Sequence, residues 1–481
     1  MAPNTESHGQ QPGNMSFETL KSNIQHTTTA RLGKLGISGR KDIETPNFFS
    51  IGSRGVVPHL TPDVISAHAQ FSGIHMALED FIERATTGTP PVMNVPGDSP
   101  LHTFTALPSH FTTLLAPRRT PAVSAPTGNS NTAISIFTST GFQVLPNKAY
   151  TTYITKLSPD LAVGLADVPY GTVPGTKRIA KMGDRTETWL TELLAAKPER
   201  TAIFAPILPI DSNAQSEYLN HLDDIADRIH GLAFYDPNTL PDIPATTALT
   251  RLPRLSLSEP RSPSQILRQI ALGMDIFTIP FINSATDAGI ALDFSFPSPK
   301  TKSESTAPLP LGTDMWAATH STSLLPLSES CTCYACTAHH RAYIQHLLSA
   351  KEMLGWALLQ IHNHAMLSAF FSAIRTSIAA GTFEEDSDVF ARVWESEMPE
   401  KTGQGPRVRG YHYKSEGPGE GKKNKAAWGN LGVGVDGGEK DADGKVLEGG
   451  LVPTEGRGSW RGRGLRRRLR VYREMHSRTS F

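Results

Sequence analysis

The sequence predicts a parallel α/β fold, and the number of repeated units favours a (β/α)8 barrel over an open sheet. Two observations support this prediction. Short apolar runs typical of strands alternate with helical spacings of apolar residues between about residues 41 and 282. The chain has 481 residues, which is enough for one large domain of roughly 250 to 350 residues, or two smaller ones, with tails.

The expected elements follow one another along the chain. Residues 41–51 indicate a short strand, a turn and a second strand, and prolines stop the next apolar run at residues 55–63. A helical spacing of apolar residues then covers residues 63–84. The later elements are strands at 134–145, 160–166, 201–208, 231–235 and 276–282, and helices at 186–196, 213–229 and 263–272.

Both ends of the chain differ in composition from the middle. Residues 1–15 are rich in Gly, Pro, Gln and Asn, and residues 401–481 are rich in Gly and charged residues, so we expect both to be disordered. The folded part is then residues 16–400. The last segment carries arginines interleaved with Trp460 and Tyr472. Such a pattern is typical of an RNA contact, in which arginines bind phosphates and aromatic rings stack on unpaired bases. It is equally typical of a solvated tail or a localisation signal.

Charge and hydropathy exclude several classes of protein. Lys plus Arg equals Asp plus Glu at 46 each, so no global field recruits nucleic acid and any basic surface must be local. No apolar run approaches the roughly 18 residues of a membrane span, and residues 1–14 have no apolar signal-peptide core. These observations, with cysteines that bind metal only when reduced, lead us to expect a soluble intracellular protein.

All three cysteines lie within six positions, at Cys331, Cys333 and Cys336. An odd number argues against a closed disulfide framework. Three thiolates before a long helical pattern suit a tetrahedral Zn²⁺ that takes one further ligand, and a Cys3His shell leaves no open position for catalysis. The sequence therefore predicts a structural zinc site. The alternative is three small residues buried in a loop.

The fourth ligand would come from the histidines that follow. His339 and His340 come too soon after Cys336 to fold back easily, whereas residues 341–380 contain no proline and show apolar residues at helical spacing. His362 and His364 lie on that predicted helix, about 200° apart around its axis, so at most one faces the cysteines. The spacing alone does not choose between them.

This segment resembles the zinc subdomain of the tRNA-guanine transglycosylase family. The shared features are Cys-x-Cys-x2-Cys, His362 followed by asparagine, Lys351-Glu352, Arg375 and the Gly-x-Phe that ends at Phe383. The resemblance implies that His362 is the fourth ligand, with His364 as the contender, in a zinc subdomain spanning residues 326–385.

Shorter matches to the same family stand in order over roughly residues 30–400. They are Thr45-Pro46-Asn-Phe, Gly141-Phe-Gln-Val, Arg185-Thr186, Gly231-Leu-Ala and Gly273-Met-Asp-Ile-Phe. The resemblance implies a TIM-type barrel with a zinc insertion near its C-terminal end.

The sequence departs from this family at the residues that carry its chemistry. The family exchanges a base in tRNA through an aspartate nucleophile that attacks the ribose and a second aspartate that acts as general base. Thr278 stands at the nucleophile position and Thr138 at the general-base position. A threonine hydroxyl without a base is a poor nucleophile, so we expect the first step to fail. Asp287 is the alternative nucleophile, and Asp167 is either a residual base contact or a solvated strand-end residue.

The pattern resembles most a non-catalytic member type of the family. That resemblance implies a heterodimer with a catalytic queuine tRNA-ribosyltransferase subunit, which inserts queuine at the wobble guanine of tRNA while this chain shapes the dimer and helps to hold the tRNA. It also implies a cytoplasmic location, with peripheral association with the mitochondrial outer membrane. The alternatives are an active base-exchange enzyme that uses Asp287, and an RNA-binding scaffold that reuses the fold.

Overall fold

The computed structural model describes residues 15–22, 29–83, 88–125, 127–138, 141–171, 173–196, 200–244, 247–299 and 307–406. Almost all of the predicted N-terminal tail and the arginine-rich C-terminal segment lie outside these residues. Among the helices within the described ranges, none is both long and apolar enough to cross a membrane.

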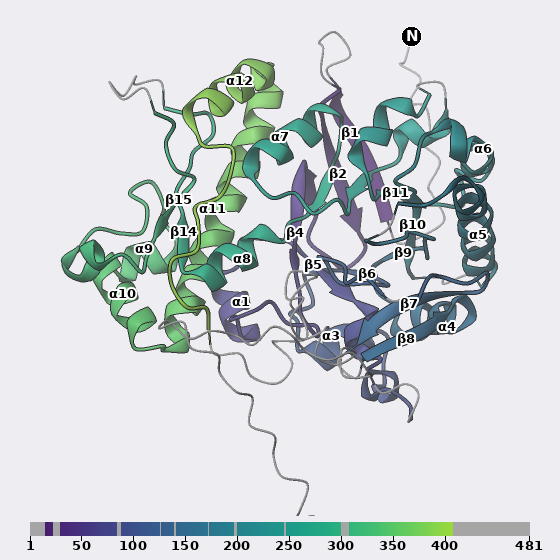
Figure 1. Cartoon of the computed structure of the whole chain (residues 1–481), viewed down its shortest axis with the longest axis horizontal. Coiled ribbons are helices and arrows are strands. Elements are labelled where there is room, and N and C mark those ends of the chain that lie inside the picture. The colour runs from purple at the N-terminus through teal and green to yellow at the C-terminus, as the bar shows by residue number, and fades with distance from the viewer. Residues whose placement is uncertain are drawn as a thin grey trace, which may run out of the picture. The chain divides into compact units, whose positions relative to one another are not determined.

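Eight parallel strands close into a barrel, as the sequence predicted (Figure 1). Every neighbouring pair is parallel, and the pairing of β13 with β4 closes the ring. In order around the barrel the strands are β10 (Ala202–Ile207), β11 (Gly231–Phe234), β12 (Arg254–Ser256), β13 (Ile276–Thr278), β4 (Asn47–Ile51), β5 (Gly73–Ala77), β6 (Thr112–Ala116) and β9 (Leu161–Val163).

Helices cover the outside of the barrel and bury one apolar face against the strands. Trp189 and Tyr218, from two of these helices, are among the largest side chains that are fully buried. The helices are α1 (Pro62–His68), α2 (Leu78–Phe81), α3 (Pro100–Thr105), α4 (Asn147–Leu157), α5 (Thr176–Ala195), α6 (Ser216–Asp224), α7 (Pro263–Ala271) and α8 (Phe281–Ala288), with short 3-10 turns at Pro91–Asn94, Asn213–Gln215, Pro237–Asp242, Ala248–Arg251 and Ala318–Thr322.

An antiparallel sheet closes the end of the barrel at which the strands begin. It consists of β1 (Met15–Ser22), β2 (Arg31–Ile37) and β3 (Ile43–Thr45). Its apolar side chains join those inside the barrel in one buried cluster. A buried ion pair joins Arg31 to Asp275 at 2.6 Å, which ties this sheet to the residue just before β13. The free mouth of the barrel is therefore the end at which the strands finish.

Six elements near the C-terminus of the described chain form a separate layer beside the barrel (Figure 1). They are β14 (Ile290–Leu292), β15 (Gly312–Asp314), α9 (Tyr334–Ala338), α10 (Arg341–Ser349), α11 (Met353–Ala380) and α12 (Phe383–Val393). Helix α11 packs against α8 and also contacts β4, so it joins this layer to the barrel wall. Gly381 ends α11 in the left-handed conformation that glycine adopts without strain.

Several predicted boundaries are wrong. The helix predicted at residues 63–84 is α1, strand β5 and α2 in succession, because β5 is apolar on both faces and periodicity does not separate a short buried strand from a helix. The helix predicted over residues 341–380 breaks where Lys351 takes a positive φ of 57°. The strand predicted at 276–282 ends at Thr278, and α8 begins at Phe281.

The strand predicted at residues 134–145 is a hairpin. Strands β7 (Ala133–Thr138) and β8 (Gly141–Pro146) pair antiparallel with each other and lie outside the barrel. The barrel strand of this region is β6, which the sequence-based prediction missed, as it missed β12.

Candidate metal centre and barrel mouth

The three cysteines converge at the start of α9. Cys333 precedes the helix, and the N–H of Cys336 donates to the carbonyl of Cys333 at 3.1 Å, which turns both sulfurs to the same side. Cys333 and Cys336 are buried and Cys331 is half-buried. The three sulfurs and one ring nitrogen of His362 all lie within 4.8 Å of one another. Residues up to 31 positions apart in the sequence thus form one compact group.

His362 reaches this group from the middle of α11 and is fully buried. Its Nδ1 lies 3.3 Å from the Cys336 sulfur and 3.8 Å from the Cys333 sulfur. Burial alone would lower the pKa of His362, but hydrogen bonds with Cys331 and Cys336 raise it to about 9. Without a metal ion, the sulfurs therefore favour a protonated His362 ring.

His364 faces the opposite side of α11, toward the barrel. Its Nε2 lies 2.8 Å from the Ser50 hydroxyl oxygen, and its Nδ1 donates to the carbonyl of Gln360 at 2.9 Å. The structure brings His362, and not His364, to the cysteines. The two histidines point to different neighbours, as their spacing on one helix predicted.

The four side chains fit a tetrahedral metal ion. Zn–S distances of about 2.3 Å and a Zn–N distance of about 2.0 Å would place nitrogen and sulfur about 3.5 Å apart, between the two separations seen here. Hydrogen bonds from Cys331 and Cys333 lower the pKa of the Cys336 thiol, and hydrogen bonds with Cys331 and Cys336 raise the pKa of the Cys333 thiol, so the three sulfurs share protons when no metal ion replaces them. Three sulfurs and one imidazole are the donor set of a closed zinc site.

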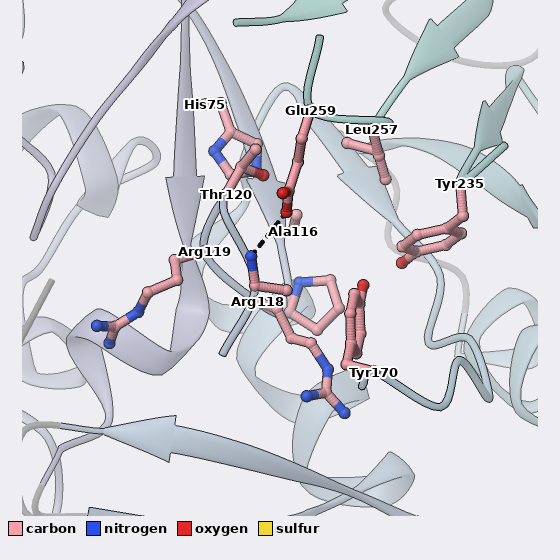
Figure 2. A pocket seen from close by; sticks show the side chains of 11 residues that line it. His75, Ala116, Arg118, Arg119, Thr120, Tyr170, Tyr235, Leu257 and Glu259 are labelled. Carbon is pink, nitrogen blue, oxygen red and sulfur yellow. Dashed lines mark hydrogen bonds between the residues drawn. The ribbon is translucent and has the colours of Figure 1, made fainter. Parts of the chain in front are cut away.

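The barrel mouth holds a cavity of about 20 Å³, which is room for a water molecule but not for a nucleobase. His75 within β5 lines it, with residues at or beyond the ends of β6, β11 and β12 and Tyr170 from the loop after β9 (Figure 2). The polar lining consists of His75, Arg118, Arg119, Thr120, Tyr170, Tyr235 and Glu259.

Arginines occupy the residues that follow β6. Arg119 donates to Glu79 through Nε at 2.9 Å and to Asp80 through Nη2 at 3.0 Å, and all three side chains are buried. Burial raises the pKa of Glu79, and the Arg119 charge opposes that shift. Arg118 lies over the ring of Tyr170, with its guanidinium carbon 4.9 Å from the ring centroid. Both carboxylates at this edge of the mouth are thus paired.

Asp167, which follows β9, is fully buried and holds two arginines. Arg185 donates to Oδ2 at 2.9 Å, and Arg178 forms a second ion pair with Oδ1. Asn129 also donates to Oδ1 at 2.8 Å. The strand-end aspartate is therefore not solvated, contrary to one of the two sequence interpretations, and its oxygens are engaged by this chain's own side chains.

Glu259 and His75 are cavity residues that sequence reasoning missed. The Ala122 N–H donates to Glu259 Oε1 at 2.8 Å, shown as the dashed line in Figure 2. Burial raises the pKa of Glu259, which the Ala122 N–H opposes. His75 is buried, and within the described residues neither of its ring nitrogens has a hydrogen-bond partner. Burial lowers its pKa to about 4. Neither residue lies in a recognisable motif, so no sequence signal pointed to them.

The two threonines of the predicted site lie apart from the cavity lining. Thr278 is fully buried at the end of β13, and its hydroxyl donates to the carbonyl of Ser256 at 3.1 Å. Thr138 ends β7 of the hairpin, not a barrel strand, and its hydroxyl donates to the carbonyl of Gly141 at 2.9 Å. The general-base position given to Thr138 therefore rests on the sequence resemblance alone.

Asp287 lies in the last turn of α8 rather than among the cavity residues. Its Oδ1 is 2.6 Å from Nε2 of His59, and the His59 side chain is buried. The alternative nucleophile is thus placed in the outer helical layer and engaged by a histidine.

Comparison with known proteins gives the family. A family model described as queuine tRNA-ribosyltransferase matches residues 25–396. The chain belongs to the queuine tRNA-ribosyltransferase family. This confirms the resemblance to tRNA-guanine transglycosylases. The matched residues include both the barrel and the cysteine-histidine group of this chain.

Individual relatives in the family carry a more specific name. Queuine tRNA-ribosyltransferase accessory subunit 2 of Schizosaccharomyces pombe is 38% identical over 417 residues, which cover 85% of this chain and 91% of that protein. Proteins of the same name from Drosophila grimshawi and Drosophila melanogaster are 28% and 26% identical, over 73% and 74% of this chain and 86% and 88% of their own lengths. The chain therefore spans most of each relative.

Proposed function

We propose that this chain is the non-catalytic accessory subunit of a heterodimeric queuine tRNA-ribosyltransferase, supporting the exchange of guanine for queuine at the wobble position of tRNA anticodons. The names of its relatives support the accessory role and imply a catalytic partner subunit. The observation that carries the non-catalytic part is the barrel mouth, where arginines hold the carboxylates of Glu79, Asp80 and Asp167.

Base exchange through a covalent intermediate needs an ionised oxygen nucleophile with open access to the ribose. Thr278 stands in the position that the family resemblance gives to this nucleophile. Its hydroxyl is buried and donates to the Ser256 carbonyl, and within the described residues no carboxylate or imidazole is hydrogen-bonded to it. Thr278 does not line the cavity of the mouth, and that cavity, at about 20 Å³, has no room for a nucleobase. These features support a barrel that keeps the family fold without its chemistry.

Glu259 favours a second candidate function, an active base-exchange enzyme with a relocated nucleophile. It is the carboxylate that lines the mouth cavity within the described residues. Three features weigh against this role: Oε1 is bound to the Ala122 N–H, burial disfavours the ionised form, and the cavity is too small for a ribose and base. The earlier candidate, Asp287, is paired with His59 and lies outside the cavity lining.

We further propose that Cys331, Cys333, Cys336 and His362 hold one Zn²⁺ with a structural role. The donor set and its spacing support this assignment. When bound, the ion would supply charge balance for three thiolates and would fix α9 to α11, with no coordination position left for a substrate. Its binding free energy would then contribute directly to folding.

The decisive experiment measures the exchange of labelled guanine into tRNA by three samples. They are the isolated chain, the chain with a wild-type catalytic partner, and the chain with a partner whose nucleophile is replaced. We expect activity in the second sample alone, and unchanged activity when the chain carries Glu259→Gln. Exchange by the isolated chain that is lost in Glu259→Gln would overturn the proposal in favour of the second candidate.

Binding to random RNA as tight as binding to cognate tRNA, in the heterodimer, would instead favour the scaffold alternative. The proposal includes a cytoplasmic location, because thiolate ligands need a reducing compartment, and peripheral association with the mitochondrial outer membrane. Fractionation of cells that express the full chain tests both locations.

A further inference from the structure

Asn363, the residue after His362, uses its whole side-chain amide in the buried layer between α11 and the barrel. Its Nδ2 donates to the Thr286 hydroxyl at 2.9 Å and to the Ile290 carbonyl at 3.0 Å. Its Oδ1 accepts from the Leu292 N–H at 2.8 Å. The side chain is fully buried, so these bonds have no competition from solvent.

Leu292 is the last residue of β14, and two consecutive residues of α11 hold both of its backbone polar groups. Its N–H donates to Asn363, and its carbonyl accepts from Nε2 of His362 at 2.8 Å. A change in the position of the Leu292 backbone would therefore move the acceptor that orients the His362 ring. Asn363 fixes this position from one side, and the pairing of β14 with β15 fixes it from the other.

The direction of this hydrogen bond settles which ring nitrogen faces the sulfurs. A carbonyl oxygen only accepts, so Nε2 of His362 carries a proton. The remaining nitrogen, Nδ1, is the atom that lies 3.3 Å from the Cys336 sulfur. The Leu292 carbonyl thus presents Nδ1, rather than Nε2, to the place where a metal ion would bind.

We propose that Asn363 is a positioning residue of the metal centre. By holding the Leu292 backbone, it fixes the orientation and the tautomer of His362 that suit the cysteine group. This inference rests on the metal site proposed above. The rival interpretation is that Asn363 merely ties α11 to α8 and β14, in which case its loss would lower stability and leave the metal site as it was.

The test uses the full chain with Asn363→Ala and two readouts that a purely structural tie would not move. Metal affinity is measured by competition between the protein and a chelator for Zn²⁺, with Co²⁺ as a spectroscopic probe of the thiolate and imidazole ligands. Losing the outer partner of a ligating histidine costs roughly 10- to 100-fold in affinity, and we expect a fall of about 10-fold because the Leu292 carbonyl is displaced rather than removed. Nitrogen-15 shifts of the His362 ring should show a mixture of tautomers in place of one.

Gln360→Ala is the matched control. Gln360 is a fully buried amide on the same helix, but its Nε2 donates to Asn283 at 2.7 Å and not to β14. We expect this variant to lose thermal stability while it keeps wild-type metal affinity, cobalt spectrum and His362 tautomer. If Asn363→Ala does not fold, Thr286→Val removes one acceptor of the Asn363 amide and should shift the same readouts in the same direction by less.

Each outcome bears on one claim. Wild-type affinity and an unmixed Nε2–H tautomer in Asn363→Ala and Thr286→Val would overturn the positioning role. A loss of metal affinity in Gln360→Ala equal to that in Asn363→Ala would also overturn it, because any weakening of α11 would then suffice. A wild-type chain that binds neither Zn²⁺ nor Co²⁺ would instead remove the metal site itself.

Discussion

The metal centre and the barrel mouth both gather buried ionisable groups from distant parts of the chain, but they balance charge in opposite ways. At the metal centre three thiols and one imidazole meet within 4.8 Å, and the thiolates would repel one another without a cation between them. At the mouth, carboxylates meet arginines, and Arg119 forms ion pairs with both Glu79 and Asp80. The thiolate cluster needs a bound cation to neutralise its charge, whereas the carboxylates of the mouth are neutralised by arginines of the same chain.

The largest expected effect is at the thiolate cluster. His362→Ala should remove the metal and lower the free energy of unfolding by more than about 5 kcal/mol, since binding energy at a structural zinc is folding energy. Urea unfolding and metal analysis of the same samples check this. The control is His364→Gln, on the opposite side of α11. The protein with this substitution should bind the metal as the wild type does. A His362→Ala chain that stays fully folded without metal would break the comparison.

The ion-paired cluster of the mouth should respond when one of its members is removed. Arg119→Met leaves Glu79 and Asp80 buried without their cation, and we expect a loss of about 3 to 5 kcal/mol in the free energy of unfolding at pH 7. Adding Glu79→Gln should restore part of it, because the remaining charge is then smaller. Metal content should stay the same in both variants. A decrease of less than about 1 kcal/mol in the free energy of unfolding would show that these ion pairs do not stabilise the barrel mouth.

His75 gives the mouth a sensitivity to acid. Its pKa is about 4 in the folded protein and 6.5 as the reference value, so the unfolded chain takes up a proton between these values. The contribution of His75 to the free energy of unfolding is therefore fully present above pH 6.5. It falls by up to about 3 kcal/mol as the pH drops toward 4. His75→Leu should lack this part of the pH dependence.

Denaturation of wild type and His75→Leu at a series of pH values tests the prediction, and the difference between them cancels the acid sensitivity of the metal site. At pH 7 the variant should be up to about 1 kcal/mol more stable, because it removes two buried nitrogens that have no partner in the described chain. Parallel pH profiles would contradict the burial of an uncharged His75.

The smallest expected effect concerns Thr278. Thr278→Val keeps the shape of the side chain and removes the hydrogen bond to the Ser256 carbonyl, so stability should fall by about 1 kcal/mol. Guanine exchange by the heterodimer should not change. A large loss of exchange at nearly unchanged stability would mean that the mouth of this subunit takes part in the chemistry.

The metal centre could be predicted from sequence more fully than the mouth. Its cysteines lie within six residues, and a helix carries His362 to them, so local spacing defined nearly the whole group. The sequence-based choice between His362 and His364 needed a family resemblance, because helical periodicity separates the two faces without naming them.

The mouth was harder because its lining comes mostly from the residues that follow the strands, and six of its eleven residues end or follow β6. Arg118 and Arg119 follow β6, which the prediction missed, and Glu259 follows β12, which it also missed. These strands are five and three residues long, too short for a clear periodicity. The barrel as a class could be predicted from the alternation of elements, whereas the contents of its mouth depend on which strands close the ring.

Helix α11 links the metal centre to the wall of the barrel at β4. His362 contacts the sulfur of Cys336, and His364, less than one turn away, is hydrogen-bonded to Ser50 in β4 of the barrel wall. Because both contacts are made by one helix, a shift of α11 at the metal centre also displaces the hydrogen bond between His364 and Ser50. Chelation of the metal should therefore speed amide hydrogen exchange in β4, a strand that contributes no ligand to it.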